Sequence, residues 1–186
     1  SVLIWSGEDD PADTLIPRLA MCNADLDKVY FIGDVKDSKG DRSFDPARDM
    51  EALRNRMTEI LDLRLLIVDP IVSAIQGDSH KNAEVRRGLQ PLVDLATAMK
   101  CALLGITHFT KGTGGREPVE RITGSLAFAA LARIVMVTAK HQSNDEGEAT
   151  KRLFCRAKSN IGPDDGGFLY EVIQGELQGH KGIVAS

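Results

Sequence analysis

The sequence predicts an α/β fold whose sheet is mostly parallel and ends in an antiparallel hairpin. Short apolar runs alternate with stretches of helical periodicity, the order expected of strands and helices in such a fold. Several of the runs are continuously apolar, which is typical of strands in a parallel sheet. Of the 186 residues, 42% are hydrophobic and 27% are charged, so the chain can bury the core of one soluble domain. We therefore expect a single domain, with a core over residues 1–140 and a hairpin region over residues 150–175.

The first strand is expected at residues 2–6, and a helix follows it. Asp10 is a suitable N-cap and Pro11 suits the first helical position, so the helix should begin there. Its apolar face would be formed by Leu15, Ile16 and Leu19. A second strand is expected at residues 29–32. Residues 33–45 are polar and rich in turn formers, which predicts a surface loop.

The middle of the chain predicts a buried strand with a helix on either side of it. Residues 65–68 are all aliphatic, which indicates a strand covered on both faces, and Asp69 and Pro70 end it. The helix before the strand has one apolar stripe, formed by Met50, Leu53, Met57, Ile60 and Leu61. The stripe of the helix after it is formed by Val85, Leu89, Leu92, Ala96 and Met99. Gly88 and Pro91 should weaken or kink this second helix.

The last third of the chain predicts shorter elements. Residues 102–107 and 134–138 are apolar and indicate two further buried strands. A glycine-rich loop and a short helix near residues 124–131 lie between them. Residues 152–157 and 168–173 predict an antiparallel hairpin that closes one edge of the sheet.

Charge and cysteine content argue against several classes of protein. The 23 Lys and Arg residues against 27 Asp and Glu residues give a net charge of −4, so any contact with nucleic acid must be local. Cys22, Cys101 and Cys155 lie far apart and form no Cys-x-x-Cys pair. This spacing argues against a zinc site and for a reducing compartment, and we expect the protein to be cytoplasmic. No uncharged stretch is long enough to span a bilayer.

Polar residues follow the predicted strands at their carboxyl ends, where parallel sheets bind ligands. They are Glu8, Asp9 and Asp10 after the first strand, Asp34 after the second, Asp69 after the third and His108 after the fourth. A carboxylate in the position of Asp69 can hold Mg²⁺ or its water shell, and one in the position of Glu8 can act as a general base on water. His108 can hydrogen-bond to a phosphate or to the attacking water. For each residue a structural role stays open: a strand cap for Asp69, a solvated acidic turn for Glu8 and a satisfied polar side chain for His108.

Two nucleotide-binding motifs do not occur in the sequence. Residues 112–116 are rich in glycine but lack the G-x-x-x-x-G-K-[ST] spacing, so we expect a loop there and not a phosphate cradle. No G-x-G-x-x-G follows a strand, which argues against a dinucleotide-binding enzyme.

Five segments, in order, share the pattern of a known family. They are residues 2–9 (VLIWSGED), 65–70 (LLIVDP), 105–112 (GITHFTKG), 121–125 (RITGS) with Arg133 downstream, and 158–160 (KSN). In these segments the chain resembles the RecA-like AAA ATPases of the RepA hexameric helicase type, which occur in plasmid and prophage replication modules. The resemblance implies a RecA-like P-loop NTPase fold with three layers, α/β/α, and ATP hydrolysis in a DNA replication helicase or a related replication or recombination ATPase.

The resemblance also implies roles for the residues at the strand ends. Glu8 would polarise the attacking water, and Asp69 would be the Walker B aspartate that acts on Mg²⁺. Asp9 would lie with Asp69 beside the bound ATP. His108 would be the polar sensor at the end of the next strand. The cofactors implied are therefore ATP and Mg²⁺.

The resemblance also implies that four basic residues contact a neighbouring subunit or DNA. Arg133 and Lys158 would reach the nucleotide of a neighbouring identical subunit, in a ring expected to be a hexamer. Lys111 and Arg116 would contact single-stranded DNA in the channel of the ring. For Arg133 a helix C-terminal charge is the alternative, and for Lys158 a solvated hairpin lysine.

The start of the chain departs from the family pattern. The phosphate-binding loop of the family should precede the first strand, whereas this sequence begins without methionine and goes directly into that strand. We therefore expect a fragment that lacks the first strand and the phosphate-binding loop, exposes apolar surface and binds ATP poorly by itself.

Two other functions remain open. One is a noncatalytic RecA-like module that regulates or scaffolds a replication or repair assembly. The other is a metal-dependent hydrolase in which Glu8, Asp34, Asp69 and His108 ligate Mg²⁺, Mn²⁺ or Zn²⁺. A G-x-x-x-x-G-K-[ST] motif encoded upstream of Ser1 in the gene would favour the ATPase.

Overall fold

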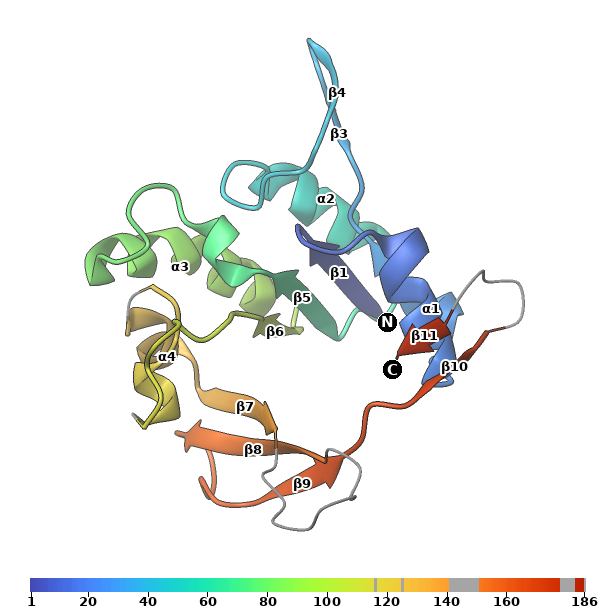
Figure 1. The fold of residues 1–186 in the computed structure, drawn as a ribbon. Helices are drawn as coiled ribbons and strands as arrows, with labels where there is room; N and C mark the ends of the chain where they lie inside the picture. Colours follow the sequence, from blue (N-terminus) through green and yellow to red (C-terminus); the bar gives the residue numbers. More distant parts are fainter. Residues whose placement is uncertain (116, 125, 141–150, 178–182, 186) are drawn as a thin grey trace.

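A four-stranded parallel sheet forms the centre of the computed structural model, which describes residues 1–115, 117–124, 126–140, 151–177 and 183–185 (Figure 1). In spatial order its strands are β2 (Val29–Phe31), β1 (Val2–Ser6), β5 (Leu65–Asp69) and β6 (Ala102–Gly105). Each lies where the sequence predicts a strand, although β2 and β6 end earlier than predicted. Together with antiparallel C-terminal strands, this sheet confirms the α/β class.

Most of the helices connect these strands, and α4 (Ala127–Leu131) lies between β6 and the C-terminal strands. The others are a π-helical turn η1 (Pro11–Leu15), α1 (Ile16–Met21), α2 (Met50–Glu59) and α3 (Asn82–Ala98), with 3₁₀ turns η2 (Leu26–Lys28), η3 (Ile71–Ala74) and η4 (Pro118–Glu120). The first begins as predicted, because Asp10 Oδ1 accepts hydrogen bonds from the backbone N–H groups of Ala12 (2.8 Å) and Asp13 (2.9 Å). None of the helices in the described ranges has the length and apolar character needed to cross a membrane.

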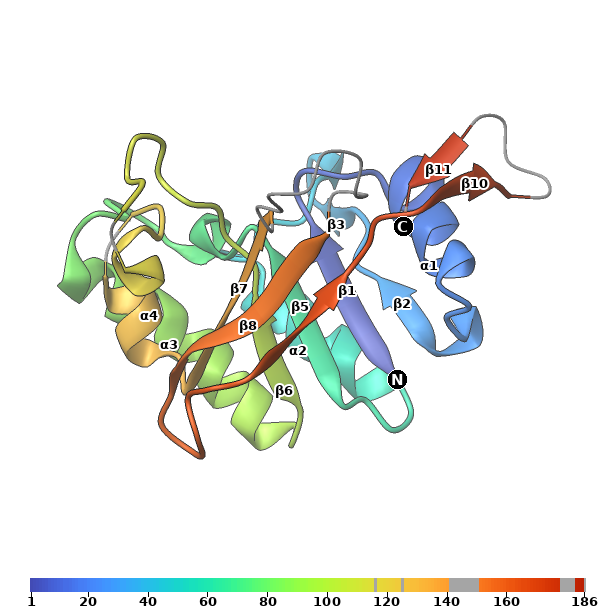
Figure 2. The ribbon, with the colours of Figure 1, turned by 60° about the horizontal axis from the view of Figure 1, so that its bottom comes forward.

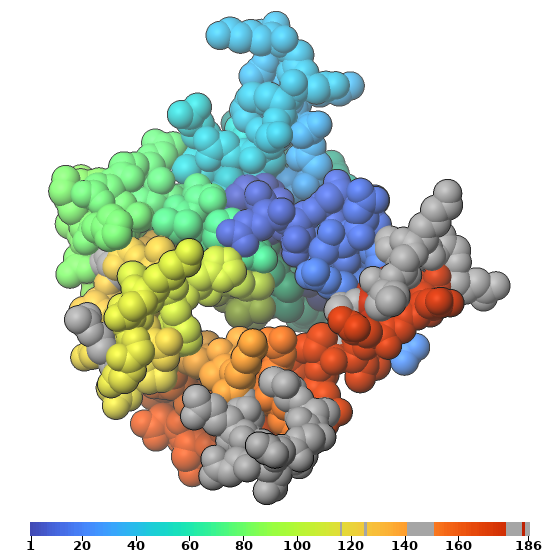
Figure 3. All heavy atoms as spheres, viewed as in Figure 1, coloured from blue at the N-terminus to red at the C-terminus, as the bar shows by residue number. Residues whose placement is uncertain are grey.

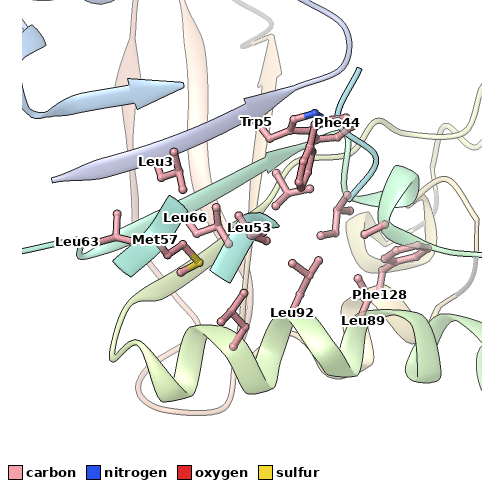
Figure 4. Close-up of a cluster of buried hydrophobic side chains, with 14 of the residues drawn as sticks. Leu3, Trp5, Phe44, Leu53, Met57, Leu63, Leu66, Leu89, Leu92 and Phe128 are labelled. Atoms are coloured by element: carbon pink, nitrogen blue, oxygen red, sulfur yellow. The ribbon is translucent and has the colours of Figure 1, made fainter. Parts of the chain in front are cut away.

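The hydrophobic core lies between one face of the sheet and helices α2 and α3 (Figure 4). Alternate side chains of β1 and β5 point into it, namely Leu3, Trp5, Leu66 and Val68. The helices contribute Leu53, Met57, Val85, Leu89 and Leu92. The intervening residues of β5, Leu65 and Ile67, are only half-buried, so the prediction that this strand is covered on both faces is wrong in part.

The C-terminal strands form a second sheet. β7 (Ile134–Lys140) pairs with β8 (Arg152–Ser159), which pairs with β9 (Gly167–Tyr170), all antiparallel. The predicted hairpin is therefore confirmed, but it does not close the edge of the parallel sheet. In the space-filling view an opening separates the region of β5 and β6 from β7 and β8 (Figure 3). Among the described strands β7 pairs only with β8. The prediction that β7 is buried is therefore wrong: Ile134 is 42% exposed and Met136 is 37% exposed.

Two further hairpins lie outside the predicted elements. β3 (Val35–Asp37) and β4 (Gly40–Arg42) pair within the predicted loop and stand out from the body (Figure 1). β10 (Gln174–Glu176) and β11 (Ile183–Ala185) pair near the C-terminus, beside α1. These strands are short, and β3, β4 and β10 carry mostly polar residues, so they lack the apolar alternation by which a strand is recognised in a sequence.

The end of α2 differs from expectation, whereas α3 runs without a break across the two residues expected to weaken or kink it. Helix α2 ends at Glu59, so Leu61 no longer follows the helical stripe and is 88% exposed, whereas Ile60 is buried. Helix α3 continues through Gly88 and Pro91. The absence of a side chain at Gly88 has a packing reason, because a Cβ there would lie 2.8 Å from Ile75 Cδ1.

Replacing Arg42 by alanine is expected to destabilise the base of the β3–β4 hairpin. Arg42 donates to both carboxylate oxygens of Asp49, at 2.7 and 2.6 Å, and to Asp37 at 2.9 Å. Asp49 is 9% exposed, and the Arg42 guanidinium holds the pKa of its carboxyl below the usual range. Because Arg42 itself is partly exposed, we expect a loss of about 1–2 kcal/mol in the free energy of unfolding by urea. The control Arg48→Ala removes a well-exposed ion pair and should cost less than about 0.5 kcal/mol. Equal stabilities of the two variants would contradict the role of Arg42.

Candidate functional site

Three of the predicted site residues meet at the carboxyl edge of the parallel sheet. Strands β1, β5 and β6 run in the same direction, so their carboxyl ends lie at one edge (Figure 2). Ser6 is in register with Asp69, and the backbone N–H of Gly7 donates to the carbonyl oxygen of Asp69 at 2.7 Å. The sheet thereby brings Glu8 and Asp69 to the same edge as His108, which follows β6.

Glu8 and His108 contact each other directly. His108 Nε2 donates to Glu8 Oε2 at 3.0 Å across 100 residues of sequence. The hydrogen bond that His108 donates to Glu8 raises the pKa of His108 above its ordinary value, against the opposing effect of partial burial. The negative charges of Glu8 and Asp69 add to the rise. Both side chains keep contact with solvent, with 67% of His108 and 47% of Glu8 exposed. A bound substrate can therefore reach them.

Asp69 is the most enclosed carboxylate of the three. Its Oδ1 is buried and has no hydrogen-bond partner in the described part of the chain. Burial raises the pKa of Asp69, and the negative charges of Glu8 and Asp9 raise it further, against the opposing effect of His108. A cation beside Oδ1 would satisfy this oxygen and favour the ionised form, so Asp69 fits Mg²⁺ or its water shell.

Two glycines let neighbouring elements approach these strand ends closely. A Cβ at Gly7 would lie 2.9 Å from the Trp5 indole, and a Cβ at Gly105 would lie 2.8 Å from Ile71. Any larger residue at either position would displace a side chain of the core next to Glu8 or Asp69.

An acidic hollow of about 710 Å³ opens beside Glu8, toward β2 and the β3–β4 hairpin. Trp5 and Phe44 line it together with the carboxylates Glu8, Asp9, Asp10, Asp34 and Asp45. The carboxylate of Asp9 pairs with Arg18 at 3.3 Å. Among the described residues no three His, Cys, Asp or Glu side chains are grouped so as to hold a metal ion. The structure therefore does not support the four-residue ligand set of a metal-dependent hydrolase.

The predicted subunit-bridging residues lie elsewhere. Lys158 Nζ donates to the carbonyl oxygens of Ala129 (2.8 Å) and Ala132 (2.9 Å), so it caps the end of α4. Arg133 is exposed directly before β7, and β7 starts at the end of the molecule opposite to the carboxyl edge of β1 (Figure 2). The structure does not bring either residue to Glu8, and their action on a neighbouring subunit stays a prediction.

The predicted nucleic-acid residues belong to the segment that follows His108. Lys111 is exposed there, and Arg116 lies outside the described residues. The sequence analysis gives a third cation of this segment, Arg121, no contact with nucleic acid. In the structure its guanidinium lies 4.2 Å from the centroid of the Phe109 ring. No spacing rule links residues twelve positions apart, so this contact depends on how the segment folds back on itself.

The Glu8–His108 contact predicts a pH dependence of stability. Because the pKa of His108 is raised in the folded chain, its contribution to stability is complete below the ordinary imidazole pKa of about 6.5 and is lost as the pH rises through the raised value. Between about pH 6 and about pH 8, wild type should lose more stability toward urea than His108→Gln, by less than about 1 kcal/mol because the pair is exposed. His80→Gln, at an exposed histidine, is the control and should behave as wild type. An identical pH dependence in His108→Gln would show that the pair contributes nothing.

Comparison with known proteins gives the family. The model of a family described as an AAA domain matches residues 1–114, which is more than half of the chain. The match includes the strand ends that carry Glu8, Asp69 and His108. The search of curated proteins found no match. With its parallel α/β sheet and this match, the chain belongs to the AAA domain family of P-loop NTPases.

Proposed function

We propose that the chain is the ATP-hydrolysing domain of a DNA replication helicase, or of a related replication or recombination ATPase. The proposal depends mainly on one observation: Glu8 and Asp69 lie at the same edge of the sheet. There Oδ1 of Asp69 is buried and has no hydrogen-bond partner among the described residues. Membership of an NTPase family fits a hydrolytic use of these two carboxylates.

In this proposal the two carboxylates have different tasks. Asp69, enclosed and close to other negative charge, would hold Mg²⁺ or its water shell. The ion would neutralise charge on the phosphates of ATP. Glu8 is exposed enough to meet a water, and Oε2 is fixed by His108, so its carboxylate is held in place to take a proton from that water. His108 would act as the polar sensor beside it.

The phosphates themselves need further residues. The 186 residues contain no G-x-x-x-x-G-K-[ST] motif, and we assign no phosphate-binding role within them. ATP turnover is therefore to be measured on the product of the whole gene.

Single-stranded DNA is the partner proposed for the segment after His108. Lys111 is exposed, and Arg121 lies against Phe109, so this segment offers positive charge beside an aromatic ring on a chain of net negative charge. This pairing suits a flexible strand of phosphates and bases. Identical subunits, in a ring expected to be a hexamer, would contribute Arg133 and Lys158 to the neighbouring nucleotide, for which Lys158 would have to leave the end of α4.

The test is the rate of ATP hydrolysis with Mg²⁺, measured with and without oligo(dT). We expect turnover that depends on Mg²⁺, rises with oligo(dT) and is lost in Asp69→Asn. Hydrolysis without any effect of DNA would leave an ATPase but contradict the helicase assignment. Absence of hydrolysis would contradict both.

One observation favours a noncatalytic regulatory or scaffold module instead, namely the lack of the phosphate-binding motif within the 186 residues. The two functions differ in nucleotide binding by the whole gene product. Tight binding of ATP without turnover, or no binding at all, would support the scaffold.

A further inference from the structure

We propose that Ser6 is a positioning residue for Glu8, because its hydroxyl group fixes the turn on which the proposed general base lies. The inference rests on the proposed function, in which Glu8 takes a proton from water, and it adds a task for Asp9. Three contacts support it: one lies within the turn, and two hold the turn on the sheet and on the first helix.

The contact within the turn joins Ser6 to Asp9. Ser6 is the last residue of β1, and its half-buried Oγ accepts a hydrogen bond from the backbone N–H of Asp9 at 3.0 Å. A serine hydroxyl that accepts from a backbone N–H a few residues later closes a local turn. Gly7 and Glu8 lie within the closed ring, so the hydrogen bond restrains the backbone dihedral angles that set the direction of the Glu8 side chain.

The sheet holds the first part of this turn. Ser6 is in register with Asp69, and the Gly7 N–H donates to the Asp69 carbonyl oxygen at 2.7 Å. The turn that Ser6 closes is therefore attached to the residue proposed to hold Mg²⁺. A fixed turn keeps Glu8 in one place relative to Asp69, and catalysis by two groups depends on such a fixed geometry.

Helix α1 holds the other end of the turn. Oδ2 of Asp9 pairs with Nη1 of Arg18 at 3.3 Å, and Arg18 belongs to α1. Asp9 is 40% exposed and Arg18 is 51% exposed, so the ion pair should add little to the free energy of unfolding. Its effect is local, since it fixes the residue whose N–H donates to Ser6. We therefore assign the Asp9 carboxylate to this anchor, in place of the position beside ATP that the sequence predicts.

Gly7 explains why the turn needs the Ser6 hydroxyl. A larger residue does not fit there, because a Cβ at Gly7 would lie 2.9 Å from the Trp5 indole. Glycine has wide conformational freedom, and without the bond to Ser6 the exposed Glu8 could take several orientations. The carboxylate would then spend less time within reach of a water, which lowers kcat without lowering the affinity for ATP.

The first experiment observes the turn in the 186-residue chain without ATP. Exchange of backbone amide hydrogens with water is measured by NMR for wild type and Ser6→Ala. The Asp9 amide should exchange at least about fivefold faster in Ser6→Ala, because its acceptor is removed. The Ala12 amide donates to Asp10 and not to Ser6, so it is the internal control and should be unchanged. Equal exchange of the Asp9 amide in both proteins would overturn the inference.

The second experiment measures ATP hydrolysis by the whole gene product. In Ser6→Ala kcat should fall by roughly 5-fold or more, while KM for ATP stays near that of wild type. Ser6→Thr, which keeps the hydroxyl group, should restore most of kcat. Ser38→Ala, at an exposed serine between β3 and β4, is the matched control and should retain the wild-type kcat.

A double variant separates an effect through Glu8 from any other effect of Ser6. If Ser6 acts only by positioning Glu8, adding Ser6→Ala to Glu8→Gln should change kcat by less than about twofold. A further loss as large as that of Ser6→Ala alone, or a wild-type kcat in Ser6→Ala, would overturn the inference and leave the ATPase proposal intact. A wild type without turnover would contradict the ATPase proposal itself.

Discussion

Glu8→Gln is expected to lower the rate of ATP hydrolysis by at least about a hundredfold. Glutamine has the size of glutamate and can still accept the hydrogen bond from His108, so the geometry at the end of β1 should persist. It cannot take a proton from water at neutral pH. The loss should therefore appear in kcat, while the affinity for Mg·ATP stays within about threefold of wild type.

The matched control for this variant is Asp13→Asn. Asp13 is an exposed carboxylate a few residues along the chain, in the first turn after the Asp10 cap, and neutralising it removes the same charge without touching the site. Phosphate release and equilibrium ATP binding are measured for both variants. If Glu8→Gln retains turnover within about threefold of Asp13→Asn, Glu8 is not the general base.

Leu66→Ala is expected to cost about 3–5 kcal/mol in the free energy of unfolding. Leu66 is 0% exposed and lies in β5, between β1 and β6, facing α2 and α3. Removing its side chain leaves a cavity under strands paired on both sides, which cannot easily close around it. A domain of this size has only modest total stability, so the variant should unfold at a much lower urea concentration.

Leu61→Ala provides the comparison for Leu66→Ala. The residue type is the same, and Leu61 is 88% exposed just beyond the end of α2. Its replacement should change the free energy of unfolding by less than about 0.5 kcal/mol. A loss in Leu61→Ala equal to that in Leu66→Ala would contradict the assignment of the core.

Local sequence signals sufficed for the parallel sheet and the first helix. The aliphatic runs of β1 and β5 are followed by acidic residues, and each run lies in a strand of the central sheet. The side chain of Asp10 sets the helix start through the hydrogen bonds that it accepts from Ala12 and Asp13, and Pro11 occupies the first helical position. These features depend on neighbours in the sequence, which is why the sequence predicts them.

Features that depend on distant partners could not be predicted. The apolar run of β7 gives no information on whether the strand joins the parallel sheet or pairs with β8, and the structure has the second arrangement. The base of the β3–β4 hairpin is held by hydrogen bonds from Arg42 to Asp49. Lys158 donates to a backbone carbonyl oxygen at the end of α4. In the last two cases a long polar side chain finds a partner that spacing in the sequence does not reveal.

The sequence predicts that the candidate site residues lie at one edge of the sheet, but it does not predict the contacts between their side chains. Strand order places Glu8, Asp69 and His108 together because carboxyl ends of parallel strands share an edge. The direct bond from His108 to Glu8 and the buried oxygen of Asp69 depend on side-chain positions, and so only the structure gives them.

The central claim, that Glu8 and Asp69 act as one hydrolytic site, is tested most directly by a double-mutant comparison of single-turnover phosphate release from Mg·ATP. Wild type, Glu8→Gln, Asp69→Asn and the double variant of the whole gene product are measured side by side. Residues that act as a unit give losses that do not add, so the double variant should be no slower than the slower single variant, within about threefold. A double variant whose loss equals the product of the two single losses would show that the carboxylates act independently and would contradict the claim.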